Sequence, residues 1–451
     1  MRSTLPSTPA EVLDISTRAR RFKMNAVVKC AELFGFWDHP YKAAATSVEE
    51  MTVTDMYYWV YKCRHPITRM EKGQRLADLL KTDSSVIGLP QGFDKRSAIT
   101  LGAGGDLLRS RGLEHSKDVL FEKVADLLFD RTVSYANFES PITEQALQDE
   151  VIGNRGPPIE CCSRAQFEVL KGHKGKTFTV LHTANNHMFD MGIEGVETTQ
   201  AVFADEGILD VGTNRAPDTF GTGTILTRDG LKLGFASATF GLNGHVMPEE
   251  ERYRIHVSKL CSTVAEPELN LLQRQIDDCK AQGCDFIIAS LHWGYEFEFF
   301  PRKRQVEVAH RLVEYGADAI LAHHPHVIQP VEYYRTRRDP ERIAVIAYSL
   351  GSLTWGFTAP HLVLSAILTL TLSKGRLAGA DRTYIEDARV TPVFRSYTDR
   401  DGKVFARIEK LADHLDGRSN AHPPDYIAEI KRYADLVLGG YNPPHEGRAV
   451  A

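Results

Sequence analysis

ADAILAHHPHVIQP, residues 317–330, joins a short apolar segment to a histidine-rich loop. Ala319–Ala322 has the length and composition of a buried strand, and His323-His324-Pro325-His326 follows it directly. Two imidazoles two residues apart, on a loop stiffened by proline, can face one metal ion or two adjacent ions. This stretch therefore predicts a strand that ends in a metal-binding loop.

Four other segments repeat this pattern, in which an apolar strand runs into a loop with Asp, Glu, Asn or His. They are Ile99–Ala103 before Asp106, Thr132–Ala136 before Glu139, Phe178–Thr183 before Asn186-His187, and Phe286–Leu291 before His292. Segments of helical period separate them, namely Glu194–Glu206, Glu268–Gln282 and Arg302–Tyr315. Thr222–Thr227 and Leu231–Ala238 flank a hairpin signal at Arg228-Asp229-Gly230. Alternating strands and helices predict an α/β fold.

We predict three parts: a helical N-terminal extension (residues 1–95), the α/β domain (96–375), and a strand and helix tail packed on the core (376–451). Within the extension, Ser47-Val48-Glu49-Glu50 matches a capping box, and Met56–Tyr61 and Met70–Leu80 have helical spacing. In the tail, Tyr426–Leu438 is helix-like. Leu362–Leu372 is about half of the ~20 residues that a membrane-spanning helix needs, so we expect a buried strand there.

The composition fits a soluble globular protein, with 43% hydrophobic and 25% charged residues. The net charge of −5 comes from mixed acidic and basic residues, which argues against a nucleic-acid partner. We see neither an export signal nor a membrane span, and expect a cytoplasmic protein. The seven cysteines include no CxxC pair, which argues against a disulfide framework or a zinc ribbon. The adjacent Cys161 and Cys162 are either a redox or metal element or, more simply, a buried pair.

The residues at the strand ends suit a divalent metal. Open α/β sheets bind ligands at the carboxyl ends of their strands. Carboxylate, amide and imidazole donors together favour one or two ions of Mn, Fe or Zn, and metal-assisted hydrolysis is the default chemistry. Singly, each residue has a simpler explanation as a turn, a cap or a core histidine, but their joint occurrence favours a metal centre. The predicted ligands are Asp106, Glu139, Asn186, His292, His324 and His326.

Three further residues are candidates for catalysis. His187 can hand a proton to a leaving group, and Asp190 can orient its imidazole. Arg111 is either an anion contact or a member of a surface salt bridge. The aromatic cluster Trp293, Tyr295, Phe297, Phe299 and Phe300 either stacks on a ring-bearing substrate or, more simply, packs in the core.

Six motifs, taken in order, resemble the capsule-synthesis CapA family of poly-γ-glutamate biosynthesis. They are GGDLLRSRG, ANFESPIT, HTANNHMFDMG, SLHWGYEFEFFP, ADAILAHHPHVIQPVEYY and IAYSLGS, within residues 98–355. The resemblance implies a calcineurin-like metallophosphoesterase fold, a four-layer α-β-β-α sandwich of two mixed sheets between helices.

The resemblance also implies roles for the candidate residues. Asp106 matches a ligand of the first metal, and Glu139 stands where a bridging carboxylate is expected. Asn186 and His292 match ligands of the second metal, and His324 and His326 match the closing histidine pair. His187 matches the residue that protonates the leaving oxygen. Asn137 would contact and orient the ligands without binding the metal itself.

This sequence departs from the related patterns in three places. Leu108 occupies the position of a phosphoesterase histidine ligand, a change that the CapA family shares, so the first metal would be bound more weakly or not at all. Ser352 replaces the Asn of the family's Tyr-Ser-Leu-Gly-Asn ending. Capsule proteins of this family are commonly anchored in a membrane, whereas this chain shows no anchor and adds the N-terminal extension.

Three hypotheses for function follow. The first is a metal-dependent hydrolase of a phosphoester or a polyglutamate-type amide, linked to capsule biosynthesis, with a small or polymeric anionic substrate. The second is a non-catalytic accessory protein that binds an anionic polymer or its synthase through the same cleft. The third is recruitment of the domain to another biosynthetic pathway. In that case the N-terminal helices either cover the cleft or form a homodimer, and exposed apolar positions on them would favour the dimer.

Overall fold

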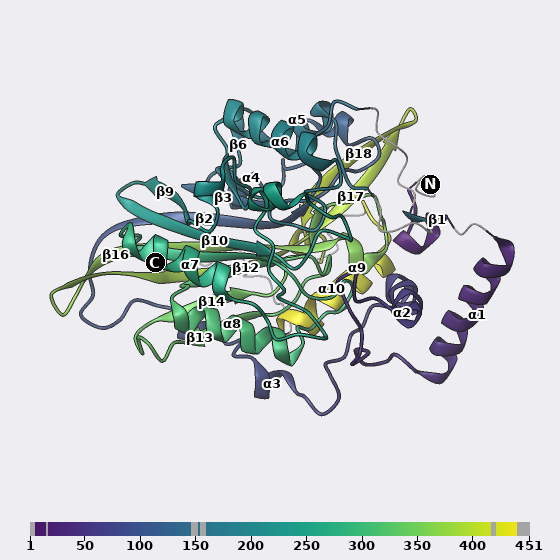
Figure 1. The fold of residues 1–451 in the computed structure, drawn as a ribbon, viewed down its shortest axis with the longest axis horizontal. Helices are drawn as coiled ribbons and strands as arrows, with labels where there is room; N and C mark the ends of the chain where they lie inside the picture. Colours follow the sequence, from purple (N-terminus) through teal and green to yellow (C-terminus); the bar gives the residue numbers. More distant parts are fainter. Residues whose placement is uncertain (1–4, 15–16, 146–151, 154–158, 416–420, 440–451) are drawn as a thin grey trace.

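The computed structural model describes the chain except for residues 1–4, 15–16, 146–151, 154–158, 416–420 and 440–451. Two large β-sheets lie at its centre, with helices around them (Figure 1). Small two-stranded sheets pair β1 (Leu13–Asp14) with β4 (Ile152–Gly153), and β5 (Gly172–His173) with β6 (Lys176–Thr177).

The first large sheet has the order β18-β17-β16-β2-β3-β7-β8, and β15 also pairs with β2. Its strands are β2 (Asp94–Leu107), β3 (Val133–Phe138), β7 (Val180–His182), β8 (Leu209–Val211), β15 (Ser352–Thr354), β16 (Leu364–Leu377), β17 (Ala380–Arg400) and β18 (Lys403–Lys410). Strands β2, β3, β7 and β8 run parallel, and β16, β17 and β18 extend the sheet as antiparallel neighbours. The predicted strand at Leu362–Leu372 is thus β16.

The second large sheet has the order β13-β14-β12-β11-β10-β9. Its strands are β9 (Thr224–Arg228), β10 (Leu231–Thr239), β11 (Phe286–His292), β12 (Ala319–His323), β13 (Val331–Arg335) and β14 (Ile343–Ala347). Strands β10, β11, β12 and β14 are parallel, and β9 and β10 form the predicted hairpin.

Ten α-helices lie in the described part of the chain. They are α1 (Arg18–Phe34), α2 (Val53–Arg64), α3 (Leu76–Leu79), α4 (Ala125–Leu128), α5 (Arg164–Leu170), α6 (Gly192–Glu206), α7 (Asn270–Ala281), α8 (Lys303–Tyr315), α9 (Pro360–Val363) and α10 (Pro424–Leu438). Short 3₁₀ turns are η1 (Pro9–Glu11), η2 (Ser84–Val86), η3 (Leu113–Ser116), η4 (Pro217–Thr219), η5 (Glu249–Arg254) and η6 (Leu411–His414). None of the helices described is long and apolar enough to cross a membrane.

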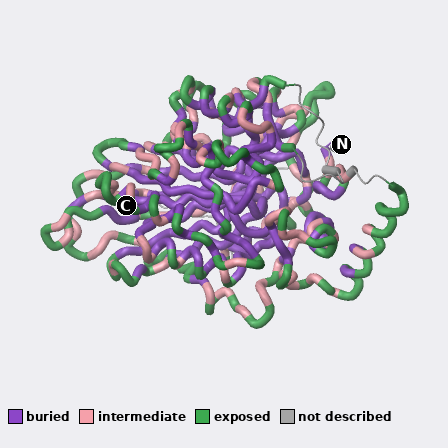
Figure 2. The backbone as a smooth tube through the Cα atoms, in the orientation of Figure 1, coloured by how far each residue is buried: buried purple, intermediate pink, exposed green. Residues whose placement is uncertain are grey.

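Three hydrophobic clusters define four layers. Between the sheets, Tyr135 of the first packs in one cluster with Ile288 of the second. Helices α7 and α8 cover the outer face of the second sheet, where Ile276 and Leu312 join the cluster of Ile287. Helices α4, α5 and α6 cover the outer face of the first sheet, where Leu128, Phe167 and Phe203 join Phe138 of β3 in a third cluster. The predicted α/β class and α-β-β-α layering are confirmed, and Figure 2 shows the buried residues concentrated in the centre.

Two predictions in the N-terminal part were wrong. Residues 47–50 form a turn, and the capping box lies at Thr52 and Asp55, which begin α2. Asp55 also accepts a hydrogen bond from the Ala45 amide (3.1 Å), so this cap ties the preceding loop to the helix. Only Leu76–Leu79 of the predicted helix Met70–Leu80 is helical, because Gly73 adopts a left-handed conformation (φ 83°) that ends any helix there.

Candidate metal centre

The predicted ligands are at or just beyond the carboxyl ends of parallel strands in both sheets. In the first sheet, Asp106 is near the end of β2, Glu139 follows β3, and Asn186 follows β7. In the second sheet, His292 ends β11, and His324 and His326 follow β12. All six side chains are buried, and the most exposed, Asn186, has a relative accessibility of 5%.

Backbone geometry fixes these positions. The Asp106 amide donates a hydrogen bond to the Gly351 carbonyl (2.9 Å). A Cβ atom on Gly105 would lie 1.9 Å from that same oxygen, so only glycine permits this approach. His324 (φ 98°) and His326 (φ 56°) both adopt left-handed backbone conformations, which are uncommon for residues with a side chain and are concentrated at functional sites.

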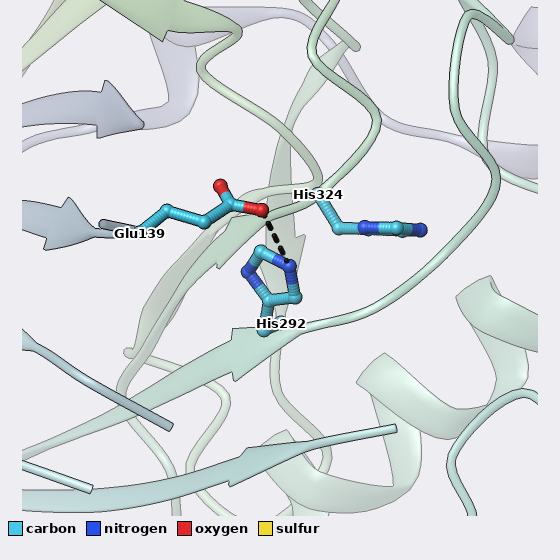
Figure 3. Close-up of side chains that lie close together, drawn as sticks. All are labelled: Glu139, His292 and His324. Atoms are coloured by element: carbon cyan, nitrogen blue, oxygen red, sulfur yellow. Dashed lines mark ion pairs between the residues drawn. The ribbon is translucent and has the colours of Figure 1, made fainter. Parts of the chain in front are cut away.

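Five of the six predicted ligands form two overlapping groups that share Glu139. One consists of Asp106, Glu139 and His326, and the other of Glu139, His292 and His324; in each group the donor atoms lie within 4.8 Å of one another. Glu139 Oε1 is 3.3 Å from His292 Nε2 and 3.8 Å from His326 Nε2. Figure 3 shows the Glu139 carboxylate and the His292 ring facing each other, with His324 on a separate loop beside them.

Several donor atoms in this cluster are buried without a hydrogen-bond partner. They are Glu139 Oε1, His292 Nε2 and His324 Nδ1, and Asn186 Oδ1 beyond the end of β7 is also buried without a partner. Each such atom costs roughly 1–3 kcal/mol of lost solvation, and groups of them call for a specific explanation. Carboxylate and imidazole lone pairs aimed at one region fit a divalent cation of the Mn, Fe or Zn type.

Burial and neighbouring charges shift the pKa values of the cluster in different directions. Burial opposes protonation of His326, but the charge of Glu139 and the hydrogen bond and charge of Asp106 outweigh it and raise the pKa of His326 to about 9. Burial raises the pKa of Glu139 to about 8. Burial lowers the pKa values of His292 and His324 well below the usual range, so both rings are neutral and keep a lone pair for a metal. Burial opposes ionisation of Asp106, but hydrogen bonds with His323 and His326 outweigh it and hold the Asp106 pKa well below its usual value.

His187 forms a tight pair with Asp190. His187 Nδ1 is 2.6 Å from Asp190 Oδ2, which also accepts a hydrogen bond from the Glu160 amide (2.8 Å). Burial opposes protonation of His187, but the Asp190 charge and hydrogen bond outweigh it and raise the pKa of His187 to about 9. Since Nδ1 faces Asp190, the protonated ring keeps Nε2–H for another acceptor.

Arg111 does not join this group. It is exposed, and within the described residues no hydrogen bond or ion pair connects it to the cluster. Arg109 of the same motif is buried instead, and its Nε lies 3.8 Å from Glu160 Oε2. Arg109 rather than Arg111 therefore brings a positive charge to Glu160, whose amide donates to Asp190.

Sequence reasoning missed several supporting residues. His323 Nδ1 is 3.0 Å from Asp106 Oδ1, and its Nε2 is 3.0 Å from the Tyr135 hydroxyl. Asn137, expected to support the ligands, donates to Asp106 Oδ1 (2.9 Å) and Glu139 Oε2 (3.2 Å). The sequence held one signal for the role of His323, namely its position directly before His324.

Ser352 and Thr46 also contact ligands. Ser352 Oγ is 2.9 Å from His326 Nδ1. Ser352, which stands where the family ending has Asn, thus contacts a predicted ligand. Thr46 Oγ1 is 3.1 Å from His324 Nε2 and belongs to the N-terminal part, 278 residues away in sequence. No local pattern could have predicted that contact.

The N-terminal segment and the aromatic cluster enclose this side of the centre. The Trp59 indole hydrogen-bonds to Glu296, whose Oε1 is 3.9 Å from His326 Nε2. A cavity of only about 10 Å³ lies here, and its lining includes Trp59, Glu296, Thr46 and Tyr295. The five aromatic residues from Trp293 to Phe300 are all buried, as core packing predicts, and Cys161 and Cys162 are buried too.

Comparison with protein families identifies a family for this chain. The model of the family described as bacterial capsule synthesis protein PGA_cap matches residues 100–355, which contain every predicted site residue. The matched segment is more than half of the 451 residues.

Among individual proteins, the chain is similar to two from Bacillus. It is 26% identical over 296 residues to the PGA biosynthesis protein CapA of Bacillus subtilis (strain 168), covering 64% of this chain and 71% of that protein. It is 26% identical over 266 residues to the capsule biosynthesis protein CapA of Bacillus anthracis, covering 57% and 60% respectively.

Two weaker similarities complete the comparison. The chain is 28% identical over 155 residues to a probable polyglutamine synthesis accessory protein of Mycobacterium tuberculosis (strain ATCC 25618 / H37Rv), covering 34% of this chain and 40% of that protein. Among solved structures, the calcineurin-like phosphoesterase YfkN from Bacillus subtilis aligns over 76% of this chain and 98% of its own at 14% identity and a TM-score of 0.35. A TM-score that low carries no argument about function.

Proposed function

Because this chain belongs to the PGA_cap family of bacterial capsule synthesis proteins, we propose that it is a metal-dependent hydrolase in capsule or poly-γ-glutamate biosynthesis. The proposed substrate is a phosphoester or a polyglutamate-type amide. The observation that carries the proposal is the pair of ligand groups that share Glu139, together with the unpartnered donor atoms aimed at the same place.

We propose that Asp106, Glu139 and His326 hold one ion, and that Glu139, Asn186, His292 and His324 hold a second. Bound there, Mn, Fe or Zn would supply Lewis acidity for hydrolysis of an ester or amide. Leu108, in place of a further ligand, leaves the first ion with fewer protein donors, so we expect it to bind more weakly.

His187 is the proposed acid. Its raised pKa keeps the ring protonated at neutral pH, Asp190 fixes the ring through Nδ1, and Nε2–H is left to donate to a leaving oxygen or nitrogen. Arg109 rather than Arg111 is placed to balance negative charge nearby, through its pairing with Glu160.

The first experiment is the metal content of protein purified without chelators, measured by mass spectrometry. The Asp106→Ala/His324→Ala variant should hold one or two equivalents of Mn, Fe or Zn fewer than the parent. His310→Ala is the matched control, because it removes a histidine that pairs with Glu332 (3.0 Å) outside the cluster. Equal metal in the parent and in the Asp106→Ala/His324→Ala variant would overturn the proposed centre.

The second experiment tests catalysis with bis-p-nitrophenyl phosphate and a γ-glutamyl p-nitroanilide. His187→Gln should keep the metal content of the parent and lower kcat about 10²–10⁴-fold, the usual contribution of a general acid. Turnover that is unchanged in His187→Gln would contradict the assigned role.

A non-catalytic accessory role is the second candidate, favoured by Leu108, which stands in place of a metal ligand. In that case metal-loaded protein would bind a poly-γ-glutamate chain without turning over either substrate, and His187→Gln would leave the affinity almost unchanged. Turnover that depends on Asp106 and His324 would exclude it.

A further inference from the structure

A second cluster of metal-ligand type lies away from the strand ends, in the C-terminal part of the chain. Glu409 is near the end of β18, His414 ends η6, and His422 precedes α10. One ligand atom from each of the three lies within 4.8 Å of the others. Within the described residues, no hydrogen bond or ion pair connects this cluster with the ligands around Glu139.

Both imidazoles use the same nitrogen toward one carboxylate. His414 Nε2 is 3.1 Å from Glu409 Oε2, and His422 Nε2 is 3.2 Å from Glu409 Oε1. Donor atoms bonded at about 2.0–2.1 Å to one tetrahedral ion lie roughly 3.3 Å apart, so these spacings match a shared ion. Two histidines and one carboxylate are also a known zinc donor set that leaves a fourth position for water.

The surroundings hold the donors in place. Phe394 pairs with Glu409 across β17 and β18, and its ring lies 5.1 Å from His414 and 5.3 Å from His422, centroid to centroid. The Ser396 hydroxyl hydrogen-bonds to Glu409 Oε1. The three side chains have accessibilities of 5% (His414), 15% (Glu409) and 17% (His422), so the cluster is fixed by packing and still reachable from solvent.

We propose that Glu409, His414 and His422 form a second divalent-metal site, of zinc type, with water in the fourth position. Helix α10 packs on the core through Tyr433, which stacks on Phe299 with centroids 5.0 Å apart, and through the Tyr426 hydroxyl, which donates to the Thr358 carbonyl (2.8 Å). An ion held by residues of β18, η6 and the approach to α10 would join this helix to the edge of the first sheet.

Zinc binding in a background without the first centre tests the site. Full-length Asp106→Ala/His324→Ala protein is dialysed against buffered Zn²⁺, and bound zinc is measured by mass spectrometry. We expect one equivalent, which is lost on adding His422→Ala and retained on adding His310→Ala, a histidine that pairs with a single glutamate. Zinc should also raise the Tm of the background protein but not that of the His422→Ala protein.

A rescue variant separates metal binding from simple hydrogen bonding. His422→Cys should restore the zinc equivalent, because a thiolate is a stronger zinc ligand than imidazole but cannot replace its hydrogen bond to Glu409. If the background protein does not fold, the same comparison in the parent should show one equivalent fewer after His422→Ala. No zinc in the background protein, or zinc that survives His422→Ala, would overturn the site. Neither result bears on the centre around Glu139.

Discussion

At the scale of single residues, the position of Asp106 depends on the lack of a side chain on its neighbour. Gly105 allows β2 to approach the Gly351 carbonyl, and the Asp106 amide donates to that oxygen. One carboxylate of the proposed centre is thus placed by a contact between two backbones.

Gly105→Ala should therefore both destabilise the protein and disturb the centre. The added Cβ would lie 1.9 Å from the Gly351 oxygen, so the strands must separate. We expect a loss of about 2–4 kcal/mol in the free energy of unfolding, measured in urea, together with a lower metal content. Gly88→Ala is the control, since a Cβ there meets nothing within 4 Å. Equal stabilities of the two variants would refute this account.

His361 gives a prediction for pH. Its Nε2 is 3.2 Å from the Cys63 carbonyl, and burial lowers the pKa of His361 to about 4. The folded protein therefore favours the neutral ring, whereas the unfolded chain protonates near pH 6.5. Stability from this group is complete above about pH 6.5 and is lost as the pH falls toward 4.

His361→Gln should remove this dependence, because its amide can still donate to Cys63 but does not titrate. The difference between the parent and variant free energies of unfolding should change by about 3 kcal/mol between pH ~7 and pH ~4, with chelator present throughout. His115→Gln, at a half-buried histidine of η3, is the control. Parallel pH profiles of the parent and His361→Gln would count against the prediction.

At the scale of elements, the strand ends were predictable because each apolar segment and its polar loop are contiguous in sequence. Strands β2, β3, β11 and β12 place Asp106, Glu139, His292 and His324 where the carboxyl ends of parallel strands meet. Contacts between distant segments were not predictable. Thr46 reaches His324 only because α2 packs on the loop that follows β11. Such a contact produces no periodic pattern in the sequence from which it could be predicted.

That docking depends on a buried charge cluster around Glu298. Its carboxylate accepts hydrogen bonds from Arg302 Nη2 (2.9 Å) on one side, and from Lys62 Nζ (3.3 Å) and the Tyr58 hydroxyl (3.0 Å) of α2 on the other. Two buried cations share one carboxylate, so its charge is required to hold α2 in place.

Glu298→Gln should cost about 3–5 kcal/mol, because it leaves Lys62 and Arg302 buried without their counter-charge. Urea unfolding measures the loss, and limited proteolysis should show earlier cleavage before residue 94. Asp78→Asn is the control. It breaks the exposed pair with Arg75 (2.7 Å) and should cost less than about 1 kcal/mol. A Glu298→Gln protein as stable as the control would disprove this role.

At the scale of the whole molecule, α1 lies at one end, away from the two sheets (Figure 1), and is mostly exposed (Figure 2). Large apolar side chains on it and just after it face solvent: Phe22 (78% exposed), Leu33 (69%), Phe34 (70%) and Phe36 (67%). Apolar groups exposed together are typical of interaction surfaces, so a homodimer through the N-terminal helices remains our prediction.

Light scattering coupled to size-exclusion chromatography tests this prediction. The parent should have the mass of a dimer, and Leu33→Glu/Phe34→Glu that of a monomer, because burying two carboxylates in an apolar contact is costly. Val264→Glu is the control, since Val264 is 82% exposed on a different surface loop. A parent that is monomeric at every concentration would rule out the dimer.

The division of the ligands between the two sheets also sets an order of events during synthesis. The carboxylates and the amide, at positions 106, 139 and 186, leave the ribosome well before the imidazoles at 292, 324 and 326. At about 5–20 residues per second, the interval between Glu139 and His326 is roughly ten to forty seconds. The ligand sets proposed here are complete only after the last histidines have been synthesised. Metal loading is therefore a late step that cannot guide early folding.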